Sequence, residues 1–148
     1  MDLTQDDIDI IRASYMQLSS DLQRSGDVFY EALFDIAPDT RELFLADMSS
    51  QAMKLMSTIG LVVSQLQNSE ALEPVVKDLA LRHLAYGVEE QHYGQVREAL
   101  FRMLGIVLDS AYSDEARIAW GKAYDGLADV MVRVAYPERK GKQSRAIT

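Results

Sequence analysis

Apolar residues recur along nearly the whole chain at the three- and four-residue spacing that is typical of amphipathic helices. The first helix is expected to follow Thr4, a good capping residue with Asp7 as its capping-box partner. Its apolar stripe consists of Ile8, Ile11, Tyr15 and Leu18. An alternation typical of β-strands never persists for more than a few residues, so the sequence predicts an all-α protein.

The next part of the chain predicts two more helices and the start of another. One helix is expected over residues 21–36. Pro38 suits the first turn of a short helix that ends near Phe44, because a missing amide proton costs nothing there. Either Ser49 or Ser50 can cap the helix that follows.

The second half of the chain continues the helical pattern, for about seven helices in total. Two adjacent stripes are Ala52, Leu55, Ile59, Val62 and Leu66, and then Leu72, Val75, Val76, Leu79 and His83. Gly87 suits the position after the second stripe, where a left-handed conformation is common. The last helices are expected over residues 90–111 and 114–136, with Ser113 as a cap. Helices with such short connections favour either a globin-like fold or an ordinary helical bundle.

Length and composition indicate one domain with a charged end. The 148 residues suit a single domain, expected over residues 4–136. Residues 137–148 carry a net charge of +3 and are expected to form a flexible, solvated basic tail. The absence of cysteine excludes disulfides, thiolate metal sites, covalent c-type haem attachment and a catalytic thiol.

Charge and hydropathy narrow the classes of partner. The net charge of −8 argues against nucleic acid, whose binding depends on basic patches. The longest apolar runs, such as residues 59–63, are too short to cross a membrane. An acidic N-terminus without a basic flank argues against a secretory signal, so we expect a cytoplasmic protein.

Two histidines are the residues most relevant to chemistry. His83 lies on an apolar helical stripe, where a buried imidazole either bonds to the backbone or binds a ligand; the spacing leaves both readings open. His92 begins the next helix and is expected to be structural. Zinc motifs, glycine-rich phosphate loops and a second Glu-x-x-His copy for a di-iron bundle are all missing.

Three segments together resemble the globin domain of bacterial flavohaemoglobins and their single-domain relatives. The first combines Phe29-Tyr30 with Pro38 and Phe44, the second is residues 82–88 (RHLAYGV) followed by His92-Tyr93, and the third is residues 119–124 (AWGKAY). The resemblance covers about residues 4–134 and implies a globin fold around a b-type haem.

The resemblance also implies a role for individual residues. His83 corresponds to the proximal iron ligand, and Phe44 to the phenylalanine that stacks on the haem edge. Tyr30 and Gln51 correspond to the residues that face the bound gas, and Leu55 to the apolar wall beside them. Such hydrogen-bond donors imply tightly held, slowly released O₂.

The resemblance implies further contacts between the chain and the haem. Tyr93 corresponds to the tyrosine that packs beside the proximal histidine in flavohaemoglobins, and Lys54 is a candidate for a haem propionate, although an ordinary exposed lysine is an equal reading. Ile59 and Val88 belong to the apolar shell expected around the porphyrin, whereas Trp120 is expected in the core. The family's relay glutamate in the last helix falls on Ala135, which argues against a strongly peroxidase-like site.

The expected activity is reversible binding of O₂, NO or CO, with conversion of NO and O₂ to nitrate when a separate reductase supplies electrons. Two alternatives remain at this point. One is a gas or redox sensor module lacking its output domain, and the other is a haem-free globin fold used for protein interaction. His83 argues against the second, because haem-free relatives lack a histidine at that position.

Overall fold

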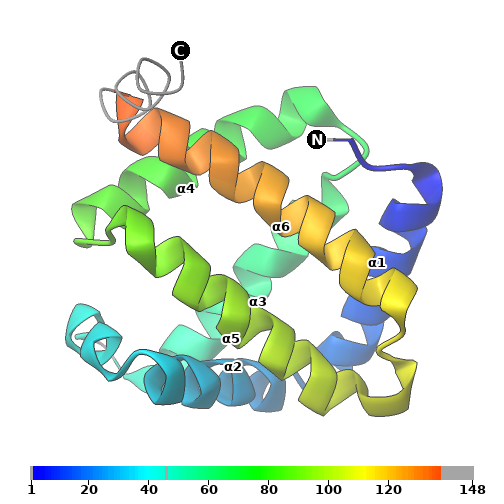
Figure 1. The fold of residues 1–148 in the computed structure, drawn as a ribbon, viewed down its shortest axis with the longest axis horizontal. Coiled ribbons are helices and arrows are strands. Elements are labelled where there is room, and N and C mark those ends of the chain that lie inside the picture. Colours follow the sequence, from blue (N-terminus) through cyan, green and yellow to red (C-terminus); the bar gives the residue numbers. More distant parts are fainter. Residues whose placement is uncertain (1, 46, 138–148) are drawn as a thin grey trace.

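A computed structural model describes residues 2–45 and 47–137, which form helices and short turns (Figure 1). The α-helices are α1 (Gln5–Leu18), α2 (Leu22–Ile36), α3 (Met48–Ser64), α4 (Ser69–Ala85), α5 (Glu90–Leu108) and α6 (Asp114–Ala135). Three 3₁₀ segments complete them: η1 (Ser19–Asp21), η2 (Pro38–Leu43) and η3 (Asp109–Ala111). The all-α prediction is confirmed; the described residues form six α-helices rather than about seven, because the expected third helix is the 3₁₀ segment η2. The predicted basic tail, apart from Pro137, lies outside the described residues.

Side-chain caps fix most helix starts where the sequence predicts them. The Thr4 side chain accepts a hydrogen bond from the Asp7 amide, and the Asp7 side chain accepts one from the Thr4 amide, so the capping box is confirmed. Ser113 caps α6 as expected. The predicted cap of α3 by Ser49 or Ser50 is wrong, because Asp47 accepts from the Ser50 amide and both serines lie inside the helix. A carboxylate is an equally good cap and adds a favourable charge at the helix start.

The helices pack in crossed pairs. Helix α2 packs against α3 and α5, while α1 and α4 both pack against α6. In Figure 1, α5 and α6 run diagonally in front of α3. The α2–α3 crossing is close, because a Cβ on Gly26 would lie 2.6 Å from the carbonyl oxygen of Ala52. A larger residue than glycine at position 26 would therefore force these helices apart.

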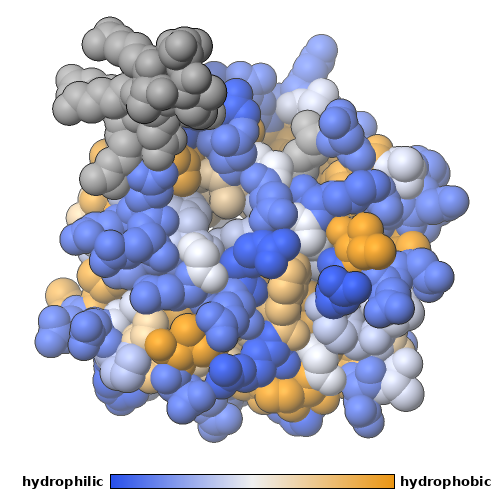
Figure 2. All heavy atoms as spheres, viewed as in Figure 1, coloured by the Kyte–Doolittle hydropathy of each residue, from blue (hydrophilic) through white to orange (hydrophobic). Residues whose placement is uncertain are grey.

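The core is apolar and draws on every α-helix. Ile11, Leu33, Met56 and Leu104 are almost fully buried, and Trp120 is buried as predicted. On the face drawn in Figure 2, hydrophilic residues cover most of the surface and hydrophobic residues form separate patches. No helix in residues 2–45 and 47–137 is long and apolar enough to span a membrane.

Candidate functional site

Tyr30 and Gln51 meet between α2 and α3. The side-chain amide of Gln51 donates a hydrogen bond of 3.1 Å to the Tyr30 hydroxyl. Tyr30 is buried, and Gln51, in the first turn of α3, is half-buried. Because the hydroxyl oxygen accepts this bond, the phenolic proton remains available, and no acceptor for it lies in the part of the chain that the structure describes.

Aromatic rings hold Tyr30 in place. The Phe29 and Phe44 rings meet the Tyr30 ring edge-on, with centroids 5.0 and 5.1 Å away, and Phe34 lies 5.8 Å away. Phe44 follows the last residue of η2, so this turn delivers it to the cluster. Burial raises the pKa of Tyr30 above its ordinary value, and the Gln51 bond offsets this in part. Tyr30 is therefore a neutral hydrogen-bond donor at physiological pH.

His83 lies in the last turn of α4, and one ring nitrogen is engaged. Its Nδ1 lies 2.7 Å from the Leu79 carbonyl oxygen. A carbonyl oxygen can only accept, so Nδ1 carries the proton and Nε2 keeps its lone pair. Burial lowers the pKa of His83, which favours the neutral ring. No hydrogen-bond partner of Nε2 lies within residues 2–45 and 47–137.

A neutral imidazole with a bare Nε2 and a backbone acceptor on Nδ1 is the form in which histidine binds a metal. The backbone bond fixes the tautomer and the orientation of the ring. Among the described residues, no cluster of three or more His, Cys, Asp or Glu side chains could hold a bare metal ion. A single free histidine nitrogen could serve only a metal whose other ligands come from elsewhere, for example from a cofactor.

Helices α3 and α4 each present a second, half-buried face beside their core face. On α3, the half-buried residues Gln51, Leu55 and Ile59 are spaced by four. On α4, Val75, Leu79 and His83 repeat the same spacing, while Leu72, Val76 and Ala80 are buried. These two consecutive helices are not an extensively packed pair, because α3 packs mainly on α2 and α4 on α6. Half-buried, largely apolar stripes on two helices that do not pack closely together suit the binding of a flat apolar group.

The corner after α4 is tightly constrained. Gly87 has a φ of +89°, a left-handed conformation that favours glycine, as predicted. The Val88 amide donates to the carbonyl of His83 at 3.0 Å, and the Val88 carbonyl accepts a hydrogen bond from the Tyr136 hydroxyl at the end of α6. Val88 itself is half-buried. The turn that follows His83 is thus hydrogen-bonded both to α4 and to the residue that follows α6.

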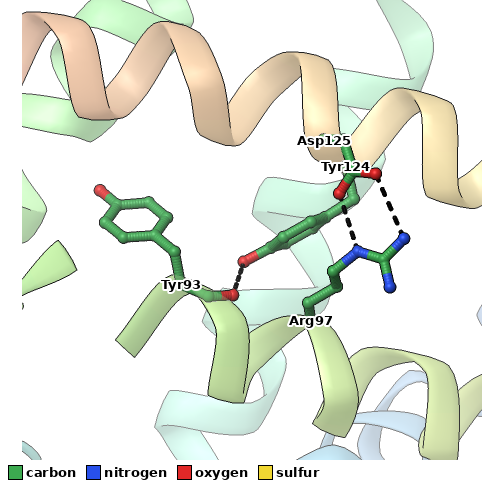
Figure 3. A network of polar contacts seen from close by, with 4 residues as sticks. All are labelled: Tyr93, Arg97, Tyr124 and Asp125. Atoms are coloured by element: carbon green, nitrogen blue, oxygen red, sulfur yellow. Dashed lines mark hydrogen bonds and ion pairs between the residues drawn. The ribbon is translucent and has the colours of Figure 1, made fainter. Parts of the chain in front are cut away.

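Tyr93 lies in the first turn of α5 next to this corner. Its carbonyl accepts a 2.6 Å hydrogen bond from the Tyr124 hydroxyl of α6, and Arg97 forms a two-pronged ion pair with Asp125 one turn further along (Figure 3). Burial, and to a smaller extent Tyr136, raise the pKa of Tyr93 to about 12. No hydrogen bond joins Tyr93 to His83 in the described part of the chain, so its packing beside that histidine stays a prediction.

The remaining residues that the sequence singled out form no side-chain hydrogen bond or ion pair with Tyr30, Gln51 or His83 among the described residues. Lys54 is exposed on α3, so its contact with a propionate remains a prediction. The Nδ1 of His92 accepts a 2.8 Å hydrogen bond from the Glu89 amide, which confirms its structural role at the start of α5. Ala135 ends α6, and the alternative carboxylate considered for the relay, Glu138, lies outside the described residues.

Sequence reasoning missed Tyr124 and Tyr136 as members of the site. Their hydroxyls reach the backbone of residues 93 and 88, which are distant in sequence. The only local signal was two tyrosines, one on α6 and one directly after it, in a segment whose other half-buried residues are glycine or aliphatic. A surface hollow lined by Leu18, Arg24 and Val107, among others, contains none of the candidate site residues.

Comparison with known proteins points to one family. The profile of the Globin family matches residues 27–131. A flavohemoprotein of Rhizobium meliloti (strain 1021) is 30% identical over 132 residues, which cover 87% of this chain and 33% of that protein. An uncharacterized globin-like protein of Aquifex aeolicus (strain VF5) is 28% identical over 130 residues, covering 88% of this chain and 92% of that protein.

A solved structure supports the fold independently. The crystal structure of a hexacoordinated heme protein from an anhydrobiotic tardigrade, at pH 4, superimposes with a TM-score of 0.81 at 18% identity. The match covers 90% of this chain and 96% of that one, so the helix arrangement is shared nearly end to end. The chain spans about a third of the length of the flavohemoproteins that it matches.

Proposed function

The chain belongs to the globin family, and from this membership we propose that it binds haem b through His83 and a gaseous ligand beside Tyr30 and Gln51. Haem iron supplies the bond to O₂, NO or CO, and the protein supplies one axial nitrogen and the surroundings. In this proposal Phe44, Leu55, Ile59 and Val88 exclude water from the porphyrin, Tyr93 packs on the side of His83, and Lys54 reaches a propionate.

The observation that carries the proposal is the state of His83. Its Nδ1 proton is committed to the Leu79 carbonyl at 2.7 Å, which leaves the Nε2 lone pair directed away from its own helix backbone. His83 is half-buried, so this neutral nitrogen stays accessible to a ligand and free of any hydrogen bond to the described residues. The half-buried apolar residues of α3 and α4 add the surroundings that a porphyrin needs.

In this proposal Tyr30 and Gln51 lie on the side of the haem opposite His83, where they determine how firmly a gas is held. The Tyr30 proton and the second amide proton of Gln51 are both available to a small polar ligand. Each such hydrogen bond contributes about 1–1.5 kcal/mol, and up to about 3 kcal/mol when the acceptor is charged. Because O₂ becomes more polar than CO on binding, these donors favour O₂ and slow its release.

The direct test is an absorption spectrum of the purified chain after incubation with haemin, followed by reduction and exposure to CO. We expect a sharp Soret band at one haem per chain that shifts on reduction and again with CO. Failure to form that band would refute haem binding and leave a haem-free interaction module as the better account. A gas sensor without its output domain would give the same spectra, and no feature of the described residues favours it.

We extend the proposal to NO dioxygenation in the cytoplasm. Converting one NO and one O₂ to one nitrate consumes one electron, so repeated turnover needs a reductase, which we take to be a separate protein. Support comes from the flavohemoprotein relatives and from the paired donors Tyr30 and Gln51. Nitrate formation from NO and O₂ within milliseconds, repeated when a flavin reductase and NADH are added, is expected. Slow, single-turnover oxidation would restrict the chain to gas binding.

A further inference from the structure

An arginine covers the outer end of the rings around Tyr30. These rings form an aromatic cluster of Phe29, Tyr30, Phe34 and Phe44, in which the centroids of contacting rings lie 5.0 to 5.8 Å apart. The guanidinium carbon of Arg41 lies over the Phe34 ring, 5.1 Å from its centroid. Arg41 is exposed, Phe34 is half-buried and Tyr30 is buried, so these contacts lead from the surface to the buried phenol.

Arg41 contacts the aromatic cluster a second time, through its backbone. Its carbonyl oxygen accepts a 3.1 Å hydrogen bond from the amide of Phe44, the residue that follows η2. Phe34 and Phe44 are neighbours, with centroids 5.8 Å apart, and both contact Tyr30. A displacement of the Arg41 side chain would therefore free Phe34, while the backbone bond keeps Phe44 in place.

The contact between Arg41 and Phe34 is attractive in its own right. A guanidinium over the face of a ring interacts favourably with its π electrons, and the aliphatic stem covers apolar surface. Arg41 has no carboxylate partner among residues 2–45 and 47–137, so the ring is the contact that orients this side chain. Arg97 lies over Phe101 in a similar way, but it is also paired with an aspartate.

Phe34 is well placed to transmit this contact to Tyr30. It lies one helical turn after Tyr30 on α2, so the two side chains share a face of the helix. Its ring plane is inclined by 34° to that of Tyr30, whereas Phe29 and Phe44 stand at 85° and 76°. Of these three rings, Phe34 therefore lies closest to flat against the phenol, and its displacement would allow the phenol to tilt.

We propose that Arg41 is a positioning residue for Tyr30, which acts through Phe34 and slows the release of bound O₂ by keeping the phenol in place. The proposal rests on the proposed function of Tyr30 as the donor to the gas. It adds to that function a residue that lies outside the ligand site. A contact at the surface thus sets a property of a buried hydroxyl.

The test compares Arg41→Met with Arg24→Met. Methionine keeps an unbranched side chain but removes the guanidinium and its charge. Arg24 is a matched control because it is an exposed arginine of α2 whose guanidinium forms no ion pair or ring contact in the described part of the chain. Two quantities are measured: the release rates of O₂ and CO by rapid mixing, and the aromatic proton NMR shifts of Tyr30 in the haem-free chain.

We expect Arg41→Met to release O₂ about two- to fivefold faster than the wild-type chain, the effect of one lost exposed cation–π contact. CO release should stay at the wild-type rate, since bound CO is a weak hydrogen-bond acceptor, and Arg24→Met should match the wild type in both rates. The Tyr30 ring shifts should change in Arg41→Met and not in Arg24→Met. Wild-type O₂ release or unchanged Tyr30 shifts in Arg41→Met would overturn the proposal.

A double variant tests whether Arg41 acts through Tyr30. In the Tyr30→Phe background the phenolic donor is gone, so Arg41→Met should no longer change O₂ release. An undiminished effect in that background would overturn the proposal, because Arg41 would then act on the ligand by another route. Lower stability of Arg41→Met without any dependence of O₂ release on Tyr30 would indicate a merely structural role and contradict the proposal in the same way.

The outcomes for Arg41 and for haem binding are separable. If the wild-type chain fails to bind haemin, the proposed function fails. The Tyr30 shifts of the haem-free variants still decide whether Arg41 positions this ring. If the wild-type chain binds haemin and releases O₂ at the same rate as Arg41→Met, the proposal for Arg41 fails and the proposed function stands.

Discussion

The side chain of Gln51 donates a hydrogen bond of 3.1 Å to the hydroxyl of Tyr30, so the amide orients the phenol without consuming its proton. The rings of Phe29 and Phe44 meet Tyr30 edge-on and prevent it from swinging away. The result is a fixed, neutral donor whose proton has no acceptor among the described residues. Such a donor is suited to a small polar ligand.

Replacing Tyr30 with phenylalanine should therefore speed the release of O₂. The lost hydrogen bond corresponds to about 1.5–3 kcal/mol, or about 10- to 100-fold in the dissociation rate. The rate is measured by rapid mixing of the oxygenated protein with CO. Release of CO should change far less, because bound CO is a weaker acceptor.

Tyr112→Phe is the control for this prediction. The Tyr112 hydroxyl is buried without a hydrogen-bond partner in the described part of the chain, so its removal changes a phenol outside the site. Its O₂ release should match that of the wild-type protein. Equal release rates from Tyr30→Phe and wild type would show that Tyr30 does not contact the ligand.

The crossing of α2 and α3 predicts a stability effect at Gly26. A Cβ there would lie 2.6 Å from the Ala52 carbonyl oxygen, so Gly26→Ala must separate the two helices. We expect a loss of about 1–3 kcal/mol in the free energy of unfolding, measured in urea.

Gly94→Ala provides the matched comparison. This position in α5 has nothing within 4 Å of an added Cβ, so alanine should stabilise the helix by about 0.5–1 kcal/mol. Because Gln51 is carried by α3, Gly26→Ala should also weaken O₂ retention, whereas Gly94→Ala should not. Similar stabilities of the two variants would contradict the close crossing.

The local parts of this architecture follow from the sequence, and the parts that depend on packing do not. Thr4 and Ser113 cap helices as predicted, because capping involves only residues within one turn. Asp47 was missed in favour of Ser49 or Ser50, since all three residues cap well and lie within a few positions. Helix periodicity placed Leu55, Leu79 and His83 on apolar stripes, but it could not separate the core face from the half-buried face beside it.

In the candidate site, too, some residues could be predicted from the sequence and others could not. His83, Tyr30 and Gln51 were predicted from the family resemblance. The fold brings Tyr30 and Gln51 into hydrogen-bond contact. Tyr136 and Tyr124 escaped notice because their partners are backbone carbonyls of residues 88 and 93. Any residue can supply a backbone carbonyl, so the sequence does not indicate these hydrogen bonds. They become visible only once the position of α6 beside the turn between α4 and α5 is known.

The half-buried tyrosines Tyr93 and Tyr124 predict a loss of stability at high pH. Burial raises the pKa of Tyr93 to about 12 and that of Tyr124 above its ordinary value. The unfolded chain releases these protons near pH 10, whereas the folded chain retains them. The free energy of unfolding is therefore unaffected well below pH 10 and falls as the pH rises above it, by up to about 1.4 kcal/mol per pH unit for each group.

Urea unfolding of the haem-free protein between pH 9 and pH 11.5 measures this slope, which is about 1.4 kcal/mol per pH unit for one proton. Tyr124→Phe should have a shallower slope than the wild-type chain, because one of the two titrating phenols is gone. Tyrosinate absorbance at 295 nm should appear for these groups only as the chain unfolds. A slope that is unchanged in Tyr124→Phe would contradict its burial as a neutral phenol.

The most direct measurement compares haemin binding by the wild-type chain, His83→Ala and His92→Ala. The two histidines are the only ones in the chain, and the structure gives them different tasks: His83 keeps a bare Nε2, whereas His92 closes the start of α5. We predict that the wild type and His92→Ala take up one haemin per chain and form the same ferrous CO spectrum. His83→Ala should lose this spectrum, with partial recovery on addition of imidazole. Normal spectra from His83→Ala, or their loss in His92→Ala alone, would contradict the assignment of His83 as the iron ligand.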